Sequence, residues 1–314
     1  MAFVLPKGII HEIEKRLRSF LERHCRHGCL KVAWDQVCKL IEEGGLGVRD
    51  ILALNSAMMS QRLWEVIQNS SSSIWVQWVY SVRLRGTTIW TVSLTGGSWS
   101  WRKMLRLRTH MLPNVTCHIG DGHDCIKWGM GRGQFDNTAL TNFFRPPGPK
   151  VGWSSLFLGH FKIPRNAFTL WLVILGRLFT LDKPWLRHLD GMCILCSDGL
   201  VETHQHLFFD CQYAQRCISS IRRSVRFPWP YWDWTNGISW ASSRWREKHV
   251  VNAAYRALLA SLVYHVWQER NRRRFQSTER TPSVLGHCIL EECKQRIISA
   301  ELSNSISTHA LYRL

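Results

Sequence analysis

One cluster of cysteines and a histidine constrains this 314-residue chain more than any other feature of its sequence. Cys193 and Cys196 are separated by two residues, His206 follows after nine more, and Cys211 after another four. A two-residue gap lets two thiolates reach one metal ion from a single tight turn, and thiolate and imidazole donors suit zinc. Four protein ligands close the coordination shell, so we predict one structural zinc ion here.

Two neighbouring side chains could replace a ligand, and the sequence leaves both substitutions open. His204 lies close to His206, but Leu207-Phe208-Phe209 directly after His206 is typical of a buried stripe, which favours His206. Cys217 fits better as a core residue of the helix that begins near Leu207. We expect Asp198-Gly199 to form the turn between the two halves of the site, and His206 and Cys211 to lie at the start of that helix.

The other cysteines favour a reducing compartment. Eleven cysteines are an odd number, and outside the cluster they are scattered, which argues against a disulfide scaffold. The most apolar run, residues 166–176, is too short to cross a bilayer, and residues 1–6 are too short for a signal peptide. We therefore expect an intracellular protein, nuclear or cytoplasmic, without a membrane partner.

The charge of the chain points to a polyanionic partner. Forty-one Lys and Arg against 23 Asp and Glu leave a formal charge of +18, and many of the 17 tryptophans lie beside cations. Basic chains with such aromatics are typical of RNA- or DNA-binding proteins, and nothing in the sequence indicates a small-molecule substrate. The candidate phosphate contacts are Lys103, Arg106, Arg108, Arg222, Arg223, Arg270, Arg272, Arg273 and Arg274.

Apolar spacing predicts several helices in the first part of the chain. We expect helices over residues 7–24 and 32–41, the second ending at Gly44-Gly45, and a third that Asp50 caps and that buries Met58. After a linker at residues 70–73, Ser98 should precede a basic helix over residues 99–108. Alternating apolar residues on either side of Gly120-Asp121-Gly122 predict a β-hairpin near residues 115–128.

The second part of the chain is also predicted to be helical. Residues 168–179 are predicted to form a buried helix, and residues 250–275 a long helix with a basic end. Residues 228–234 are predicted to be an extended segment, which covers the core or, as the alternative, forms a binding patch. The predicted fold class is mainly α, with helical segments around a small zinc-binding module and one β-hairpin. Breaks in composition predict three regions, residues 1–130, 131–220 and 221–314.

Several segments together resemble one known family. They are the cluster with Glu202 and Thr203 and residues 206–209, the helix entry at residues 163–168, the upstream stretches 31–34, 43–47 and 99–102, and residues 267–271. In this combination they resemble the zinc-binding domain that follows the reverse transcriptase domain in plant LINE-type non-LTR retrotransposon polyproteins. The resemblance implies a role in copying element RNA into DNA, beside a reverse transcriptase domain.

The sequence lacks the residues that such a polymerase needs. Polymerases of this kind hold two metal ions on carboxylates that include an adjacent Asp-Asp pair, and no Asp-Asp occurs in the chain. We therefore expect no enzymatic activity, and a non-catalytic accessory region that binds zinc and nucleic acid. The alternative is a structural or protein-interaction remnant that packs on a polymerase domain and has no activity alone.

Overall fold

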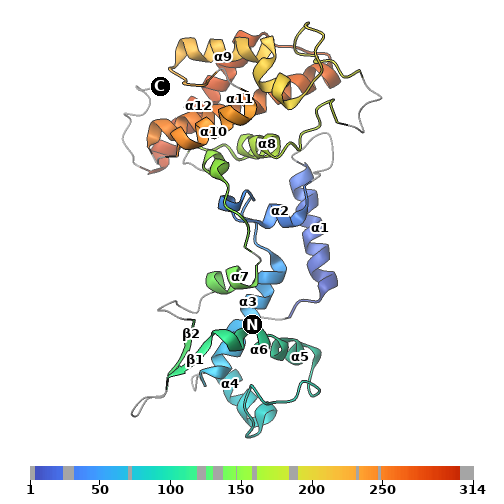
Figure 1. The fold of residues 1–314 in the computed structure, drawn as a ribbon, viewed down its shortest axis with the longest axis vertical. Helices are drawn as coiled ribbons and strands as arrows, with labels where there is room; N and C mark the ends of the chain where they lie inside the picture. The colour runs from blue at the N-terminus through green and yellow to red at the C-terminus, as the bar shows by residue number, and fades with distance from the viewer. Residues whose placement is uncertain are drawn as a thin grey trace. The chain divides into compact units, whose positions relative to one another are not determined.

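The computed structural model describes residues 4–23, 32–69, 73–118, 125–129, 137–145, 147–157, 161–183, 190–230, 233–246 and 249–304. The predicted fold class is confirmed, because these residues are mainly helical and form one two-stranded antiparallel sheet (Figure 1). Contacts divide the chain into two compact units, the first made of Met1–Phe20, Trp34–Lys39 and Leu46–Pro149 and the second of the rest. The three regions predicted from composition stay a prediction.

Most elements of the described part of the chain are helices, and the two strands lie between α6 and α7. The helices before the hairpin are α1 (Lys7–Arg23), α2 (Trp34–Cys38), α3 (Ile51–Ile67), α4 (Ile74–Trp78), α5 (Trp99–Arg106) and α6 (Arg108–Met111). The hairpin strands are β1 (Val115–His118) and β2 (Cys125–Trp128). The later helices are α7 (Asn137–Phe144), α8 (Pro164–Ile174), α9 (Gln212–Ser224), α10 (Trp234–Arg244), α11 (Val250–Gln276) and α12 (Pro282–Asn304).

Local capping positions α3 as predicted. The Asp50 carboxylate accepts hydrogen bonds from the backbone N–H groups of Leu52 and Ala53 at 2.8 and 3.1 Å, which satisfies two of the donors that a helix start leaves unpaired. The predicted apolar stripe was wrong in one detail. Met58 is 37% exposed, and the adjacent Met59 is the methionine that packs into the core.

The predicted β-hairpin is confirmed by its two strands. Val115 pairs with Trp128 and Cys117 with Ile126 in antiparallel register. The Trp128 ring packs edge-on against Trp64 of α3, with ring centres 6.1 Å apart, so the hairpin is anchored on the core of the first unit. The predicted turn at residues 120–122 and most of the predicted linker at 70–73 lie outside the described residues.

The helix predicted over residues 32–41 is shorter in the structure. α2 ends at Cys38, and a 3-10 turn follows that Gly44 closes with φ +82°. A Cβ at Gly44 would lie 2.7 Å from the Trp153 ring, and the Gly44 carbonyl accepts a 2.9 Å hydrogen bond from the Trp171 indole. The positive φ and the nearby Trp153 ring both require a residue without a Cβ at this position, which the sequence pattern does not show.

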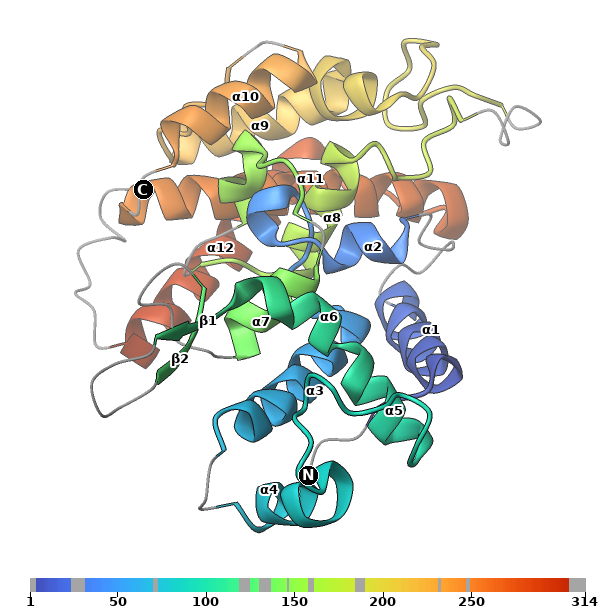
Figure 2. The same ribbon diagram turned by 60° about the horizontal axis from the view of Figure 1, so that its bottom comes forward.

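In the second unit α8, α11 and α12 lie side by side, and α9 packs on α12 (Figures 1 and 2). The buried helix predicted over residues 168–179 begins earlier, at Pro164, which is suited to the first turn of a helix. It also ends earlier, and Gly176 adopts φ +64° just after it. Trp229, in the segment predicted to cover the core, is buried between Phe209 and Trp245. None of the helices in the described part of the chain is long and apolar enough to span a bilayer.

A buried polar network joins α8, α11 and α12. The Asn166 amide donates hydrogen bonds to Ser261 at 2.8 Å and to Glu292 at 2.7 Å, and His265 lies 3.1 Å from the same carboxylate. Burial by itself would raise the pKa of Glu292, but hydrogen bonds from His265, Arg165 and Asn166 outweigh it and hold this pKa at about 2.

Glu292→Gln should therefore destabilise the protein in a pH-dependent way. A folded-state pKa of about 2, against about 4.3 in the unfolded chain, corresponds to roughly 3 kcal/mol of stability above pH ~4.5, lost as the pH falls toward ~2. Urea unfolding followed by circular dichroism at several pH values should show the gap between wild type and variant closing over that window.

The comparison with wild type removes the effect of acid on zinc binding, which both proteins share. Glu291→Gln is the matched control, because Glu291 is the exposed neighbour of Glu292 and pairs only with Lys294 on the same helix. A gap of the same size at neutral and acidic pH would contradict the assignment of this stability to the Glu292 charge.

Candidate metal centre

The first half of the predicted site is a short hairpin-like turn, residues 191–202, which we call the knuckle. Its two arms are joined by hydrogen bonds from the Cys193 N–H to the Leu200 carbonyl and from the Glu202 N–H to the Gly191 carbonyl, both 2.8 Å. Gly199 takes φ +64°, which confirms the turn predicted at Asp198-Gly199. The arms hold the Cys193-x2-Cys196 loop in place.

In the second half, His206 begins a π-helical turn, His206–Asp210, and Cys211 directly after it is the N-cap residue of α9. In an α-helix, side chains five residues apart point about 140° away from each other. The Cys211 N–H instead bonds to the His206 carbonyl at 2.7 Å, the i to i+5 pattern of a π-helix, which brings the two side chains to the same side. The Thr203 hydroxyl accepts the His206 N–H at 2.9 Å and starts this turn.

These two halves bring all four predicted ligands together. The donor atoms of Cys193, Cys196, His206 and Cys211 lie within 4.8 Å of one another. The Cys193 and Cys211 sulfurs are 4.0 Å apart, and the Cys196 sulfur lies 3.3 Å from His206 Nε2. Two thiolates on one tetrahedral zinc ion lie about 3.8 Å apart, because each Zn–S bond measures ~2.3 Å.

The donor set and its spacing therefore fit one zinc ion. Cys193, His206 and Cys211 are buried and Cys196 is half-buried, so little water reaches the centre. The hydrogen bond with Cys211 lowers the pKa of Cys193 to about 5, and the same bond raises that of Cys211. Metal binding would displace the protons that the thiols still hold.

His204 and Cys217, the possible substitute ligands, lie outside this group of four. Burial lowers the pKa of His204 to about 4, so its imidazole is neutral beside Lys183 and Asp182. Cys217 is fully buried on α9, and burial raises its pKa to about 12. Both side chains belong to the packing around the module.

A buried ion pair attaches the knuckle to α11. Arg270 donates hydrogen bonds to both carboxylate oxygens of Glu202, at 2.6 and 2.9 Å, and the two side chains are 4% and 0% exposed. The Arg270 guanidinium also lies over the Trp267 ring, 4.9 Å from its centre. Arg270 was predicted to contact phosphate, but the structure places its charge inside the protein.

The neighbouring arginines of α11 also have internal partners. Arg273 pairs with the buried Glu269 at 3.1 Å, and Arg272 lies 3.9 Å from the same carboxylate. Arg274 donates to the Asp190 carbonyl at 3.4 Å, next to the knuckle. The basic end of α11 therefore packs against the metal-binding module. Arg272 and Arg274 are half-buried, so only part of each side chain is exposed for other contacts.

The remaining predicted cations differ in their exposure. Arg106 on α5 and Arg223 on α9 are exposed, while Lys103 and Arg222 are half-buried. Arg108 donates two hydrogen bonds to backbone carbonyls, at 3.0 and 2.8 Å, and so has a structural task. Lys103, Arg106 and Arg108 belong to the first unit, and the two α9 arginines to the second.

The Glu202–Arg270 pair was missed at the level of sequence, although a signal for it exists. Leu258, Leu262, Val266 and Arg270 follow one another at intervals of four, so Arg270 continues the buried stripe of α11. A cation on such a stripe requires a buried partner. The sequence does not show which carboxylate supplies it.

Two comparisons with known proteins agree with this geometry. Residues 135–217 match a protein family described as zinc-binding in reverse transcriptase. Over 136 residues the chain is 32% identical to a protein of Arabidopsis thaliana provisionally named as a ribonuclease H protein, a match that covers 40% of this chain. The chain spans about a fifth of the length of this curated relative, 21%. No solved structure matches the chain.

The fold and the site define a zinc-binding module built into a helical scaffold. All four ligands lie within the matched residues 135–217. Residues 135–217 thus match the family described as zinc-binding in reverse transcriptase, which confirms the resemblance predicted from sequence. Within the described residues, no other group of His, Cys, Asp and Glu side chains is arranged to hold a metal ion.

Cys193→Ser should abolish stoichiometric zinc binding. The wild-type protein should carry one zinc ion per chain, and loss of a thiolate should melt the module, since structural zinc contributes on the order of 10–16 kcal/mol in small zinc-binding peptides. Elemental analysis of the purified protein measures the stoichiometry. Cys217→Ser is the matched control, a buried cysteine outside the cluster, and it should keep the ion. Retained zinc in the Cys193 variant would refute the ligand assignment.

Arg270→Ala should destabilise the zinc-loaded protein by about 3–5 kcal/mol, because it leaves the Glu202 carboxylate buried and unpaired. The double variant Glu202→Met/Arg270→Met, which removes both charges at similar volume, should lose much less. Urea unfolding measures both, with the exposed Arg223→Ala as control. A loss below ~1 kcal/mol for Arg270→Ala would mean that the pair is solvated in solution.

Proposed function

We propose that the chain is a non-catalytic, zinc-binding and nucleic-acid-binding accessory region of a plant LINE-type retrotransposon reverse transcriptase. The observation that carries this proposal is the four-ligand cluster inside a segment of the reverse transcriptase zinc-binding family. The zinc ion, when bound, supplies cross-linking and no reaction, since four protein ligands leave no position for water or substrate. The chain would work in the nucleus or cytoplasm, beside a reverse transcriptase domain.

Surface charge supports the nucleic-acid part of this proposal. The net charge of +18 already counts the carboxylates that pair with Arg270 and Arg273, so these internal ion pairs leave it unchanged. Arg106 and Arg223 are exposed at the C-terminal ends of α5 and α9, and each guanidinium group could contact a phosphate. Such cations bind phosphates without reading the base sequence.

We further propose that this chain has no hydrolase or polymerase activity of its own. The name of the Arabidopsis relative refers to ribonuclease H, but the matched residues cover only 21% of that protein. Two-metal nucleases and polymerases need clustered carboxylates. The acidic stretch Gly120-Asp121-Gly122-His123-Asp124 is better explained as a hairpin turn and lies outside the described residues.

A second candidate function is docking on a polymerase domain without a separate nucleic-acid role. The observation that favours it is the apolar side of α1, where Ile9 is 50% and Leu17 is 37% exposed. A protein partner would cover such a face. Aggregation of the chain expressed alone, relieved by co-expression with a reverse transcriptase domain, would support this function over the first.

The nucleic-acid proposal predicts a steep dependence of RNA binding on salt. Filter binding of single-stranded RNA should weaken as salt rises, and Arg106→Ala and Arg223→Ala should each reduce the log–log slope by about 0.7, the value for one phosphate contact on a single strand. Arg16→Ala, on α1 and paired with Glu12, serves as the control outside the proposed set. Absence of binding at low salt, or binding independent of salt, would rule out this function.

A further inference from the structure

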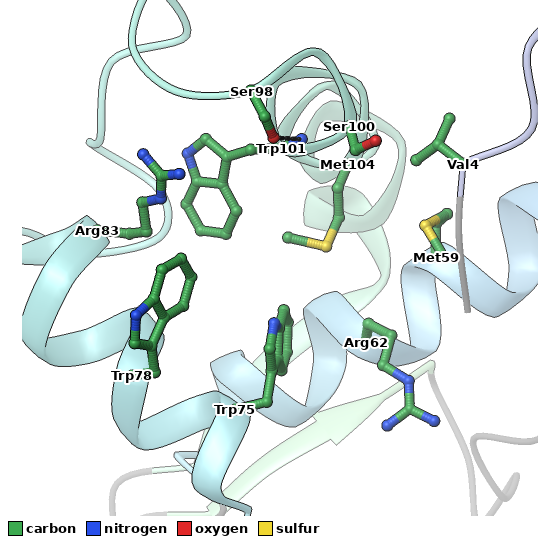
Figure 3. A pocket seen from close by; sticks show the side chains of 10 residues that line it. All are labelled: Val4, Met59, Arg62, Trp75, Trp78, Arg83, Ser98, Ser100, Trp101 and Met104. Atoms are coloured by element: carbon green, nitrogen blue, oxygen red, sulfur yellow. Dashed lines mark hydrogen bonds between the residues drawn. The ribbon is translucent and has the colours of Figure 1, made fainter. Parts of the chain in front are cut away.

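The first unit contains a cavity of about 360 Å³ that has no part in the metal centre. Trp75 and Trp78 of α4 line one side of it, and Trp101 and Met104 of α5 line the other (Figure 3). Arg83, on the π-helical turn that follows α4, lies beside two of the rings. Cavities of this size with aromatic walls and a few polar groups are typical of ligand sites.

Contacts within the protein hold part of the cavity wall in place without a ligand. Trp101 is buried in the core cluster of the unit, and its backbone N–H donates a hydrogen bond to the Ser98 hydroxyl, which caps the start of α5. Gly97 has φ +88°, and a Cβ there would lie 2.8 Å from the Trp101 ring and 3.1 Å from Arg83 Nη1. Glycine thus lets the loop approach both groups, while Trp78 stays 44% exposed at the opening.

Arg83 carries a positive charge that no carboxylate in the described part of the chain neutralises. Its Nε is buried without a hydrogen-bond partner there. Arg62, which also lines the cavity, differs because Glu65 accepts two hydrogen bonds from it, at 2.7 and 2.8 Å. Residues 66–120 contain six Arg or Lys and no Asp or Glu. A buried, unpaired donor of this kind favours a ligand that brings an acceptor.

The chemistry of the walls separates the possible ligands. Aromatic cages bind quaternary ammonium groups, but here the Arg83 guanidinium already lies 5.3 and 6.0 Å from the centres of the Trp78 and Trp101 rings. Proline-rich peptides dock on aromatic grooves but bring no phosphate to the exposed Arg102 and Arg106 of α5. A nucleotide has a flat base for the indoles, acceptors for Arg83 and phosphates for those cations.

We propose that this cavity takes up one unpaired base of a single-stranded nucleic acid. The base stacks on the tryptophan rings, and Arg83 donates a hydrogen bond to an acceptor on the edge of the base. The inference rests on the proposed function, since it requires that the chain binds nucleic acid. It adds that the bound strand is single and that the cavity is where one of its bases binds. A duplex, whose bases are already stacked and paired, cannot place a base in the cavity.

The test measures the affinity of the full-length chain for a short fluorescein-labelled single-stranded RNA by anisotropy. Trp78→Ala should weaken binding by about 5- to 150-fold, the range found for one base stacked on one aromatic ring. This ring is exposed, so its loss should leave the fold intact. Trp99→Ala is the matched control, because Trp99 is 42% exposed on α5 and does not line the cavity.

The role of Arg83 is tested with Arg83→Lys and Arg83→Met. Both should weaken single-strand binding, the lysine variant less, because lysine keeps the charge but lacks Nε and the planar fork. Arg85→Met, two residues away and exposed, should stay close to wild type. A single 2-aminopurine in the RNA should be quenched by stacking in the wild-type complex and less so in Trp78→Ala. The effect of Trp78→Ala should also persist at high salt, where phosphate contacts are screened.

Two results overturn the inference in distinguishable ways. If wild type binds RNA and the Trp78 and Arg83 variants match the Trp99 and Arg85 controls, the cavity takes no base and the proposed function stands. If wild type binds no nucleic acid, both fall. Equal affinity for single strand and duplex, or displacement of the RNA by a proline-rich peptide in wild type and not in Trp78→Ala, would assign the cavity to another ligand.

Discussion

The Glu202–Arg270 ion pair is the interaction on which the metal-binding part of this protein depends. The four ligands lie within nineteen positions of one another and can form a closed site locally, but a site of that size has no core of its own. The pair crosses 68 positions of sequence and fastens the knuckle to the longest helix. Because both charges are desolvated, neither can exchange its partner for water at low cost.

This pairing also changes how the basic charge of the chain is understood. A run of arginines such as residues 270–274 is read from sequence as a phosphate-binding surface. In the structure Arg270 is fully enclosed, and Arg273 pairs with a carboxylate while its guanidinium stacks on the Tyr213 ring. Charge that neutralises buried acids does not attract a polyanion. What remains for association is carried by fewer, scattered residues, among them Arg106 and Arg223.

The tryptophans likewise divide into two groups with different tasks. Trp171 and Trp229 are buried in the core of the second unit. The Trp171 indole N–H donates a hydrogen bond to the Gly44 carbonyl. Trp75, Trp78 and Trp101 line a cavity beside the Arg83 guanidinium, which has no carboxylate partner among the described residues. The metal thus fixes structure in one unit, and the aromatic cavity offers binding in the other, without either site needing residues of both.

The sequence by itself determined the features that depend on neighbouring residues. The ligand spacing, the Asp50 cap, the Asp198-Gly199 turn and the strands of the hairpin all follow from local geometry, and the structure contains each of them. The tertiary structure alone decided where α2 ends, which methionine of α3 is buried, that His206 lies on a π-helical turn, and that Arg270 faces Glu202. These depend on which distant groups meet, because desolvation and packing act between segments that the sequence does not place side by side.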